Sequence, residues 1–412
     1  MKKNYLKPAI LIFMFIVRLM PLAAADYGIL ADQSLDLSAH GPNFNDGEIN
    51  YAGTVIPFVS VSFGEKSYFL LSAGLTYRFD PFLYAPELLQ TEISFGIGPH
   101  EIKAGRMQYT DPLGIIAHGF FDGLSLLFNT KAGRIEIGGW YTGFLFKTRA
   151  NIAMTEDELL RLDEGVKFDS LENFKNTYFA PKRILSAVSW ENYYLGGLID
   201  FRFTALGQFD LTDADLNSQY FIAEFALLTK HFVFDLGGCF ELIQDSTGWE
   251  FQEMKKALAV KAGLTFKFPT YKERTLSLHG IYTSGVFEDG SFSPFLPLTT
   301  IPQGDLLNVK ISGLSVFSLN YLAKPAEVLS LNWSASYFVR SDLGTYHHYP
   351  VIGIDSDGHF LGPEFYLKLF WNTSSGFKMT TGGGFFIPAL GNAARDMDVL
   401  WKMEVSFVFS LL

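Results

Sequence analysis

The sequence predicts an all-β fold, a transmembrane antiparallel β-barrel, and three observations carry this prediction. The chain of 412 residues is rich in Phe (41), Tyr (19) and Gly (38). Charged residues make up only 18% of it, against about 25% in ordinary soluble domains. Segments of about 10–14 residues alternate apolar and polar side chains, which suits strands that cross a bilayer better than the shorter strands of globular proteins. These features favour a barrel in an outer membrane.

Residues 1–25 are expected to be a secretory signal peptide. Three lysines within the first seven residues precede an apolar run over 9–17. Ala23 and Ala25 then have the A-x-A spacing of a cleavage site before Asp26. A membrane anchor is the alternative, but the apolar run is too short to span a bilayer.

Residues 26–412 are expected to form a single transmembrane β-barrel domain, because no linker or low-complexity tract interrupts them. The whole chain has a formal net charge of -11, which argues against nucleic acid as a partner. The lone Cys239 cannot form an internal disulfide. The expected partners are outer-membrane lipid, diffusing small solutes and the barrel-assembly machinery, and no cofactor is expected.

The stretch 328–340, VLSLNWSASYFVR, shows the strand pattern most clearly. Every second residue from Leu329 is apolar, and the intervening row is mostly polar. The pattern recurs at 195–208, 257–268 and 361–372, and in each case the polar row carries charge. A sheet in a soluble protein would show the same alternation. The lengths of the connections therefore have to decide between a soluble sheet and a membrane barrel.

The chain accommodates 18 candidate strands, with 16 as the next choice. Short connections alternate with longer ones such as 147–182, 286–308 and 341–357. Outer-membrane barrels have even strand numbers, short periplasmic turns and long outer loops, which is this alternation. The candidate strands cover residues 28–38, 49–63, 66–80, 89–98, 100–110, 119–130, 132–146, 183–191, 194–208, 217–229, 231–244, 255–268, 273–285, 309–323, 325–340, 358–372, 375–387 and 398–411.

A barrel of this size leaves an aqueous lumen, and the charges that line it select the solutes that pass. The expected function is therefore an outer-membrane porin for small hydrophilic or anionic solutes, saccharides among them. The alternation places charges of both signs on the lumen side. These are Arg134, Glu136, Asp200, Arg202, Asp235, Glu241, Lys261, Lys267, Lys310, Arg340, Glu364 and Lys368.

Two other functions stay open at this point. A transporter of hydrophobic compounds, like the fatty-acid transporters, is one, although residues 26–50 are short and polar where those proteins carry a plug. A surface adhesin or structural barrel is the other. An enzyme is not expected, because the sequence contains neither G-x-S-x-G nor H-E-x-x-H and has no paired Cys motif.

The longer connections contain two local signals. In TEDELLRLDEG, Thr155 and Glu158 fit a capping box, so a short helix is expected there, with Gly165 as its end. We expect this helix to cap the outer rim, and narrowing of the pore is the alternative. A second segment, 346–359, contains three His and two Asp residues, which we interpret as a solvated turn because no metal motif is complete.

Residues 104–112, AGRMQYTDP, followed by GFFDGLSL, resemble the alginate-export and related substrate-specific porins. The segment LGPEFYLKLFWNTSSGFKMTTGGGFFIP is similar to the closing hairpin of that group. The resemblance implies an 18-stranded barrel, places Arg106 near the lumen, and puts Asp122 and Gly123 at the start of a strand. Arg106 paired with a neighbouring carboxylate in the wall is the alternative.

The last strand and the scattered aromatic residues complete the pattern. In WKMEVSFVFSLL the apolar row alternates cleanly, as in the C-terminal assembly signal of outer-membrane proteins, although Leu412 falls out of phase. Aromatic residues near strand ends are expected to form the interfacial girdles. They are Tyr51, Tyr77, Trp140, Trp371 and Trp401.

Overall fold

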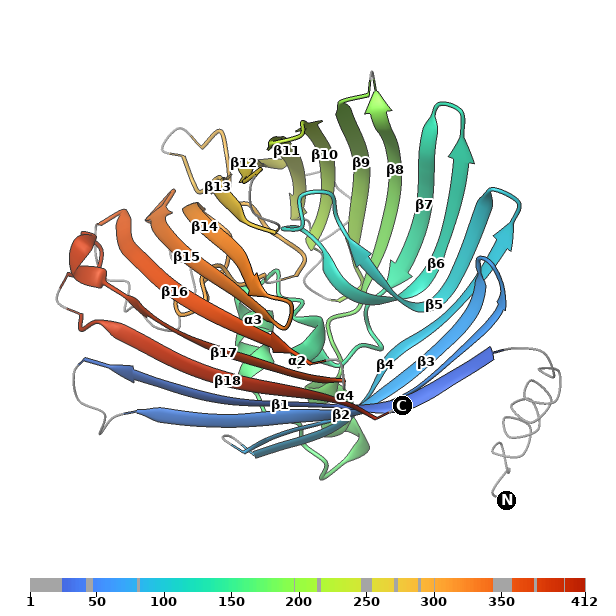
Figure 1. The fold of residues 1–412 in the computed structure, drawn as a ribbon, viewed down its shortest axis with the longest axis horizontal. Helices are drawn as coiled ribbons and strands as arrows, with labels where there is room; N and C mark the ends of the chain where they lie inside the picture. Colours follow the sequence, from blue (N-terminus) through green and yellow to red (C-terminus); the bar gives the residue numbers. More distant parts are fainter. Residues whose placement is uncertain are drawn as a thin grey trace.

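The structure, a computed structural model, is a closed antiparallel barrel of 18 strands (Figure 1). Each strand pairs with its neighbours in sequence, and β1 pairs with β18 from Ile29↔Leu411 to His40↔Leu400 to close the barrel. The predicted strand number is therefore confirmed. The structure describes residues 24–41, 47–79, 82–195, 197–212, 216–245, 254–269, 273–287, 290–299, 301–343, 358–373, 376–395 and 397–411.

The strands follow one another around the barrel in chain order. They are β1 (Ala24–His40), β2 (Glu48–Gly64), β3 (Ser67–Phe79), β4 (Phe82–Ile97), β5 (His100–Thr110), β6 (His118–Thr130), β7 (Gly133–Tyr141), β8 (Arg183–Leu195), β9 (Ile199–Asp210), β10 (Leu216–Leu228), β11 (Phe232–Asp245), β12 (Lys255–Lys267), β13 (Thr275–Thr283), β14 (Leu314–Ala326), β15 (Leu329–Arg340), β16 (Phe360–Asn372), β17 (Phe377–Phe386) and β18 (Leu400–Leu411).

Three short helices, α2 (Lys147–Ala150), α3 (Glu156–Asp163) and α4 (Leu171–Tyr178), lie between β7 and β8, and η2 (Pro388–Leu390) precedes β18. Within the described ranges, no helix combines the length and the apolar character needed to cross a membrane.

The alternation of side chains gives the wall two unlike faces. Leu264, Phe317 and Met403 belong to an apolar row that stays exposed on the outside of the barrel. In the neighbouring positions the strands turn side chains such as Thr204 and Glu241 inward, and these are fully buried. The outer face is the one that suits hydrocarbon, as the sequence pattern predicts.

Strand boundaries differ from the prediction where a loop or a proline interrupts the pattern. β4 begins at Phe82 and not at residue 89. The strand can include Pro86 because this residue lies on an edge of the sheet, where no backbone N–H is needed for a ladder hydrogen bond. β7 ends at Tyr141, and β14 begins only at Leu314. The residues removed from these two strands belong to loops that enter the barrel.

Three outer loops fold into the lumen, and we name them by their order from the N-terminus. L3 comprises residues 111–117, L4 residues 142–182, and L7 residues 284–313. Their apolar side chains form one buried cluster with inward-facing residues of the wall. The cluster contains Leu113, Ile115, Ile116, Leu145, Ile152, Met154, Phe295, Leu296, Leu298 and Ile311 from the loops.

A candidate constriction inside the barrel

L3 is a tight loop built around one carboxylate. Asp111 accepts hydrogen bonds from the backbone N–H groups of four residues in the same loop, at 2.8–3.0 Å. Burial raises the pKa of the Asp111 carboxyl, and the four N–H donors lower it in part. Such charge-assisted bonds satisfy a backbone that is buried away from water. Asp111 therefore fixes the shape of L3.

L7 is fastened to the wall by two other carboxylates. Glu364 accepts the backbone N–H groups of Asp305, Leu306 and Leu307, and Glu241 accepts that of Leu296. Both glutamates were expected to line the lumen as selectivity residues. Their side chains do point inward, but they are buried at 3% and 0% exposure beneath L7. Their contacts are those of loop anchors.

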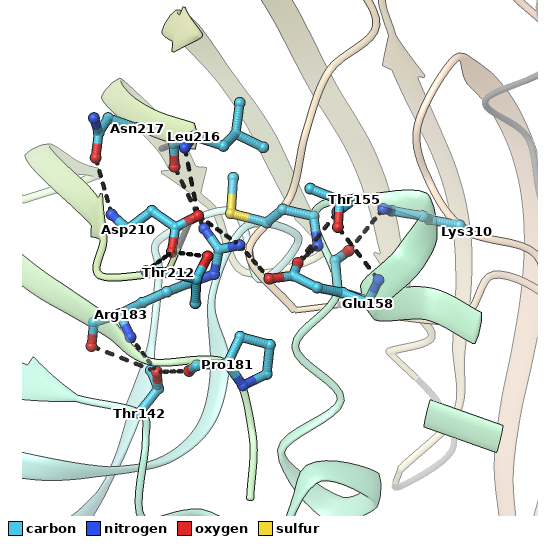
Figure 2. A network of polar contacts seen from close by, with 12 residues as sticks. Thr142, Thr155, Glu158, Pro181, Arg183, Asp210, Thr212, Leu216, Asn217 and Lys310 are labelled. Atoms are coloured by element: carbon cyan, nitrogen blue, oxygen red, sulfur yellow. Dashed lines mark hydrogen bonds and ion pairs between the residues drawn. The ribbon is translucent and has the colours of Figure 1, made fainter. Parts of the chain in front are cut away.

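L4 is held by an ion-pair network that Figure 2 shows from close by. Arg183 of β8 donates to Glu158 Oε1 at 2.6 Å and lies 3.4 Å from Asp210 Oδ2. Glu158 also accepts the backbone N–H groups of Met154 and Thr155, which completes the predicted capping box of α3. The helix ends at Asp163 with Glu164 as its C-cap, one residue before the expected Gly165.

The three loops meet one another over the lumen. Thr299 of L7 donates its backbone N–H to Ile116 of L3 and forms a β-bridge with Ile152 of L4. Lys310 donates to the Ala153 carbonyl at 2.8 Å. Burial lowers the pKa of Lys310 to about 8, although nearby glutamates raise it in part. Lys310 was expected in a strand, and it lies instead in L7.

The helix of L4 was expected to cap the outer rim, but the segment that leads into it enters the lumen. Ile152, Ala153 and Met154, just before α3, are fully buried, and Ile152 and Met154 belong to the cluster of inward loops. Figure 1 shows α2 and α3 inside the outline of the barrel. The segment before α3 thus occupies part of the lumen, as in the alternative, while most of α3 itself stays exposed. Apolar side chains in this loop bury themselves against L3 and L7 because the rim offers only water.

Below L3 a polar pocket of about 190 Å³ opens in the lumen wall. Arg202 forms an ion pair with Glu191 at 2.6 Å, and Lys103 lies 3.4 Å from Glu101. In the described part of the chain Arg134 forms no ion pair, and its Nε is shielded from solvent without an acceptor. The pocket is lined by Lys103, Met107, Gln108, Tyr109, Thr110, Pro112, Ser125, Leu127, Arg134, Glu136, Trp140, Ser189, Glu191 and Arg202.

The remaining predicted lumen residues are spread around the wall. Lys261 donates to the Leu113 carbonyl of L3, and Lys368 pairs with Asp305 of L7 at 2.5 Å. Asp200 and Asp235 face inward by register, since their partners Ala226 and Gly263 lie on the lumen row. Lys267 ends β12 and Arg340 ends β15. The structure therefore gathers Arg134, Glu136 and Arg202 in one pocket, and the other predicted residues lie outside it.

The expected place of Arg106 near the lumen is corrected by the register. Arg106 pairs with Thr91 and Asp122, and this row continues to Leu124, which is exposed on the outer face of the wall. Its guanidinium binds both carboxylate oxygens of Asp122, at 2.9 and 2.7 Å. The alternative, an arginine paired within the wall, is the one observed. Asp122 lies inside β6 and not at its start.

Of the aromatic residues expected at the membrane interfaces, all but Trp140 lie on the outer face of the barrel. Tyr51 and Tyr77 pack together on the outer face, Trp371 is exposed there, and the Trp401 indole donates to the Gly41 carbonyl. Trp140 was expected in the same girdle but faces the lumen, where its ring lies 4.4 Å from that of Tyr109. L3 makes this part of the lumen apolar, so an indole is buried there.

His347, His348, Asp355 and Asp357 lie outside the described residues, and so does Leu412. Where the structure describes the chain, no group of three or more His, Cys, Asp or Glu residues is placed to hold a metal ion.

Lys103, Tyr109, Asp111 and Glu191 belong to the constriction and were not singled out from the sequence. For Asp111 a signal existed, because an Asp-Pro pair with a Gly three residues after the Asp is typical of a side-chain-capped turn. Alternation would have placed Lys103 and Glu191 on the lumen side of their strands. No sequence feature distinguished these two residues from the other charged residues of the wall.

Comparison with known proteins gives matches in solved structures only, since neither a family model nor a curated protein matches the chain. OccK2 (OpdF) of Pseudomonas aeruginosa, in complex with glucuronate, matches at a TM-score of 0.61 and 12% identity over 94% of this chain and 97% of its own. OpdQ of the same organism gives 0.60 and 12% over 94% and 98%. OccAB1 of Acinetobacter baumannii gives 0.57 and 11% over 94% and 97%. The chain has the 18-stranded barrel fold of the OccK and Opd substrate-specific outer-membrane porins.

Proposed function

We propose that the chain is an outer-membrane channel for small hydrophilic anions and that the pocket below L3 binds a carboxylate on its way through. Arg134 carries this proposal, because its guanidinium faces the pocket without an ion-pair partner in the described chain. A guanidinium presents paired N–H donors that match a carboxylate. Ser125 and Ser189 add hydroxyl groups to the same pocket.

The anion is expected to be small and polar. The constriction formed by L3, L4 and L7 limits width, and the lumen wall offers alternating charges and hydroxyls that replace water around a hydrophilic solute. The relative OccK2 was crystallised with glucuronate, and a sugar acid of this kind suits a pocket that Arg134 and Tyr109 both line. The same comparison supports transport and not catalysis.

Export and insertion belong to the same proposal. We infer that residues 1–25 are removed as a signal peptide and that barrel-assembly machinery inserts residues 26–412 into the outer membrane. The inward face of β18 and the apolar row of Met403, Phe407 and Phe409 form the strand such machinery would engage.

Liposome swelling and planar-bilayer recording test the function. With glucuronate outside, wild-type vesicles are expected to swell several-fold faster than with a neutral sugar of similar size. Arg134→Gln is expected to remove most of this preference and to shift the reversal potential in a KCl gradient towards cation selectivity. Lys267→Gln, which removes the same charge at the exposed end of β12, serves as the control. Equal swelling rates for the two sugars in wild type would contradict the proposal.

A further inference from the structure

The ladder of the barrel wall stops early between β4 and β5. The two strands pair only from Ile97↔His100 to Thr91↔Arg106. A bulge in β4 lies next to this point, between its pairs Leu88 and Gln90 with β3, and bulges bend a strand away from its partner. The rest of β5 pairs with β6 alone in the described structure. The outer half of β4 is therefore an open edge.

L4 closes this seam in place of a strand. The Tyr178 hydroxyl of α4 donates to the Pro86 carbonyl at 2.6 Å. Arg149 of α2 pairs with Glu87 at 2.7 Å on the lumen side of β4. The rings of Phe146 and Tyr178 lie 4.9 Å apart between these contacts. At the seam the wall consists of side chains of L4.

On the outer face of the seam there is a hollow of about 460 Å³, a size within the range of ligand pockets. Leu88, Phe144, Phe174 and Phe179 line it, and the Arg106–Asp122 pair forms its floor. Arg106 is six residues from the periplasmic end of β5, which for a tilted strand is roughly 15 Å. That height is near the middle of an apolar band about 25 Å tall.

The floor offers no charge to a ligand. Arg106 donates to both oxygens of Asp122, to the Leu88 carbonyl and to the Phe144 carbonyl at 3.0 Å. An anionic headgroup would have to displace one of these partners, whereas an alkyl chain needs only the aromatic walls. Hydrocarbon of the bilayer is also what faces this side of the barrel.

We propose that this hollow binds one alkyl chain of a bilayer lipid and that the bound chain holds L4 in the seam. The proposal rests on the proposed function only in requiring that the barrel is embedded in a membrane. L4 lines the hollow with Phe144 and Phe174 and enters the constriction with Met154 and Glu158. Lipid in the seam therefore stabilises the narrowed state of the pore.

Photocrosslinking in vesicles tests occupancy. Phe174 is replaced by benzoylphenylalanine in the full chain, and Leu278, which is exposed on the outer face of β13 and does not line this hollow, receives the same residue as control. We expect a lipid-chain adduct at both positions. Leu88→Trp, which fills the hollow, should lower the yield at 174 at least threefold and leave the yield at 278 unchanged.

The control separates the two ways of failing. No adduct at 278 would contradict membrane embedding and with it the proposed function. An adduct at 278 with none at 174, or a yield at 174 that Leu88→Trp does not change, would overturn the lipid site alone. If the variant at 174 does not fold, as judged by heat-modifiable gel mobility, the same experiment is made at Phe179.

Single-channel recording tests the coupling to the pore. Wild-type closing events are expected to change at least twofold in frequency between bilayers of straight and of branched chains, and Leu88→Trp should abolish this dependence. Gly383→Leu is the matched control, because it fills a separate hollow on the outer face where an added Cβ meets ordinary contacts. A lipid dependence that survives Leu88→Trp would refute the coupling.

Discussion

At the scale of single residues, Asp111, Glu241 and Glu364 share one task. Each carboxylate accepts backbone N–H groups of a loop that has entered the barrel. A loop in the lumen cannot join the ladder of the wall, so its buried donors need side-chain acceptors. Glu241 and Glu364, which the polar-inward pattern assigns to selectivity, instead hold a loop that enters the lumen.

Asp111→Asn is expected to loosen L3. The neutral amide offers one acceptor oxygen where the carboxylate offers two, so two of the four backbone N–H groups lose a partner, at about 1–3 kcal/mol. Single-channel recording should show more frequent transitions between current levels and a higher maximal conductance than in wild type. Asp36→Asn, which removes the same charge from β1 away from L3, should leave the transition frequency unchanged.

Lys310 is expected to make the free energy of unfolding increase with pH. Its pKa falls from 10.5 to about 8 on folding, so between these values the unfolded chain binds more protons and stability rises with pH. The free energy of unfolding of wild type relative to Lys310→Met should therefore increase from pH 8 to 10.5, by at most about 1.4 kcal/mol per pH unit. Urea titrations in vesicles measure this difference, and a difference that falls with pH would contradict it.

At the scale of elements, α3 and α4 show what a sequence reveals about a loop. The capping box of Thr155 and Glu158 was predictable because it depends on residues three apart. The anchoring of α3 through Glu158 and of the preceding segment through Ile152 was not, because it depends on Arg183 and Thr299, which are distant in sequence. Local signals fix the helix, and only long-range contacts fix its place.

Thr155→Ala removes the N-cap of α3 and is expected to cost about 1 kcal/mol. Amide hydrogen exchange in the first turn of α3 should then accelerate about fivefold, and pore closings should change in frequency. Ser170→Ala removes the equivalent cap of α4, where Ser170 accepts the Asn173 N–H. There the exchange should accelerate similarly, which shows that the loss of a cap has the same local effect in both helices.

The strands themselves were predictable wherever water or lipid decides the pattern. In β15 and β16 the row that contains Leu331, Trp333 and Leu367 is apolar and faces outward, and the opposite row is mostly polar and faces the lumen. The predicted boundaries of these two strands agree with the structure within a few residues. In β5 the rule fails, because L3 makes the lumen face apolar at Met107 and Tyr109. The row of Arg106, Gln108 and Thr110 is polar and faces outward here, so alternation alone would place Arg106 on the wrong side of the wall.

At the scale of the whole molecule, the barrel has an exposed apolar exterior and a core made of loops and not of packed sheets. The buried cluster draws on L3, L4 and L7 together with β5 to β13. A soluble protein would bury its apolar row against a second layer. Here no such layer covers the outer row in the described chain, so the bilayer is the element that completes the fold.

A charge introduced on the outer row should therefore lower the stability of the barrel more than a charge introduced on the inner row. Leu367→Arg, on the outer face of β16, is expected to lower the stability of the barrel in lipid vesicles by about 2–4 kcal/mol. Ser334→Arg, which lies beside Tyr366 on the lumen row, should cost less than half as much. Urea titrations in vesicles compare the two, and equal losses would argue against lipid on the outer face.

The pairing of β1 with β18 has a consequence for biosynthesis. The first strand to leave the ribosome can find its second neighbour only after the last one has been translated, because Ile29 lies opposite Leu411. Until then both edges of the growing sheet expose hydrogen-bonding groups that would template aggregation. The edge of β1 that faces β18 therefore stays unpaired for longer than any other strand edge, since it waits for the last strand of the chain.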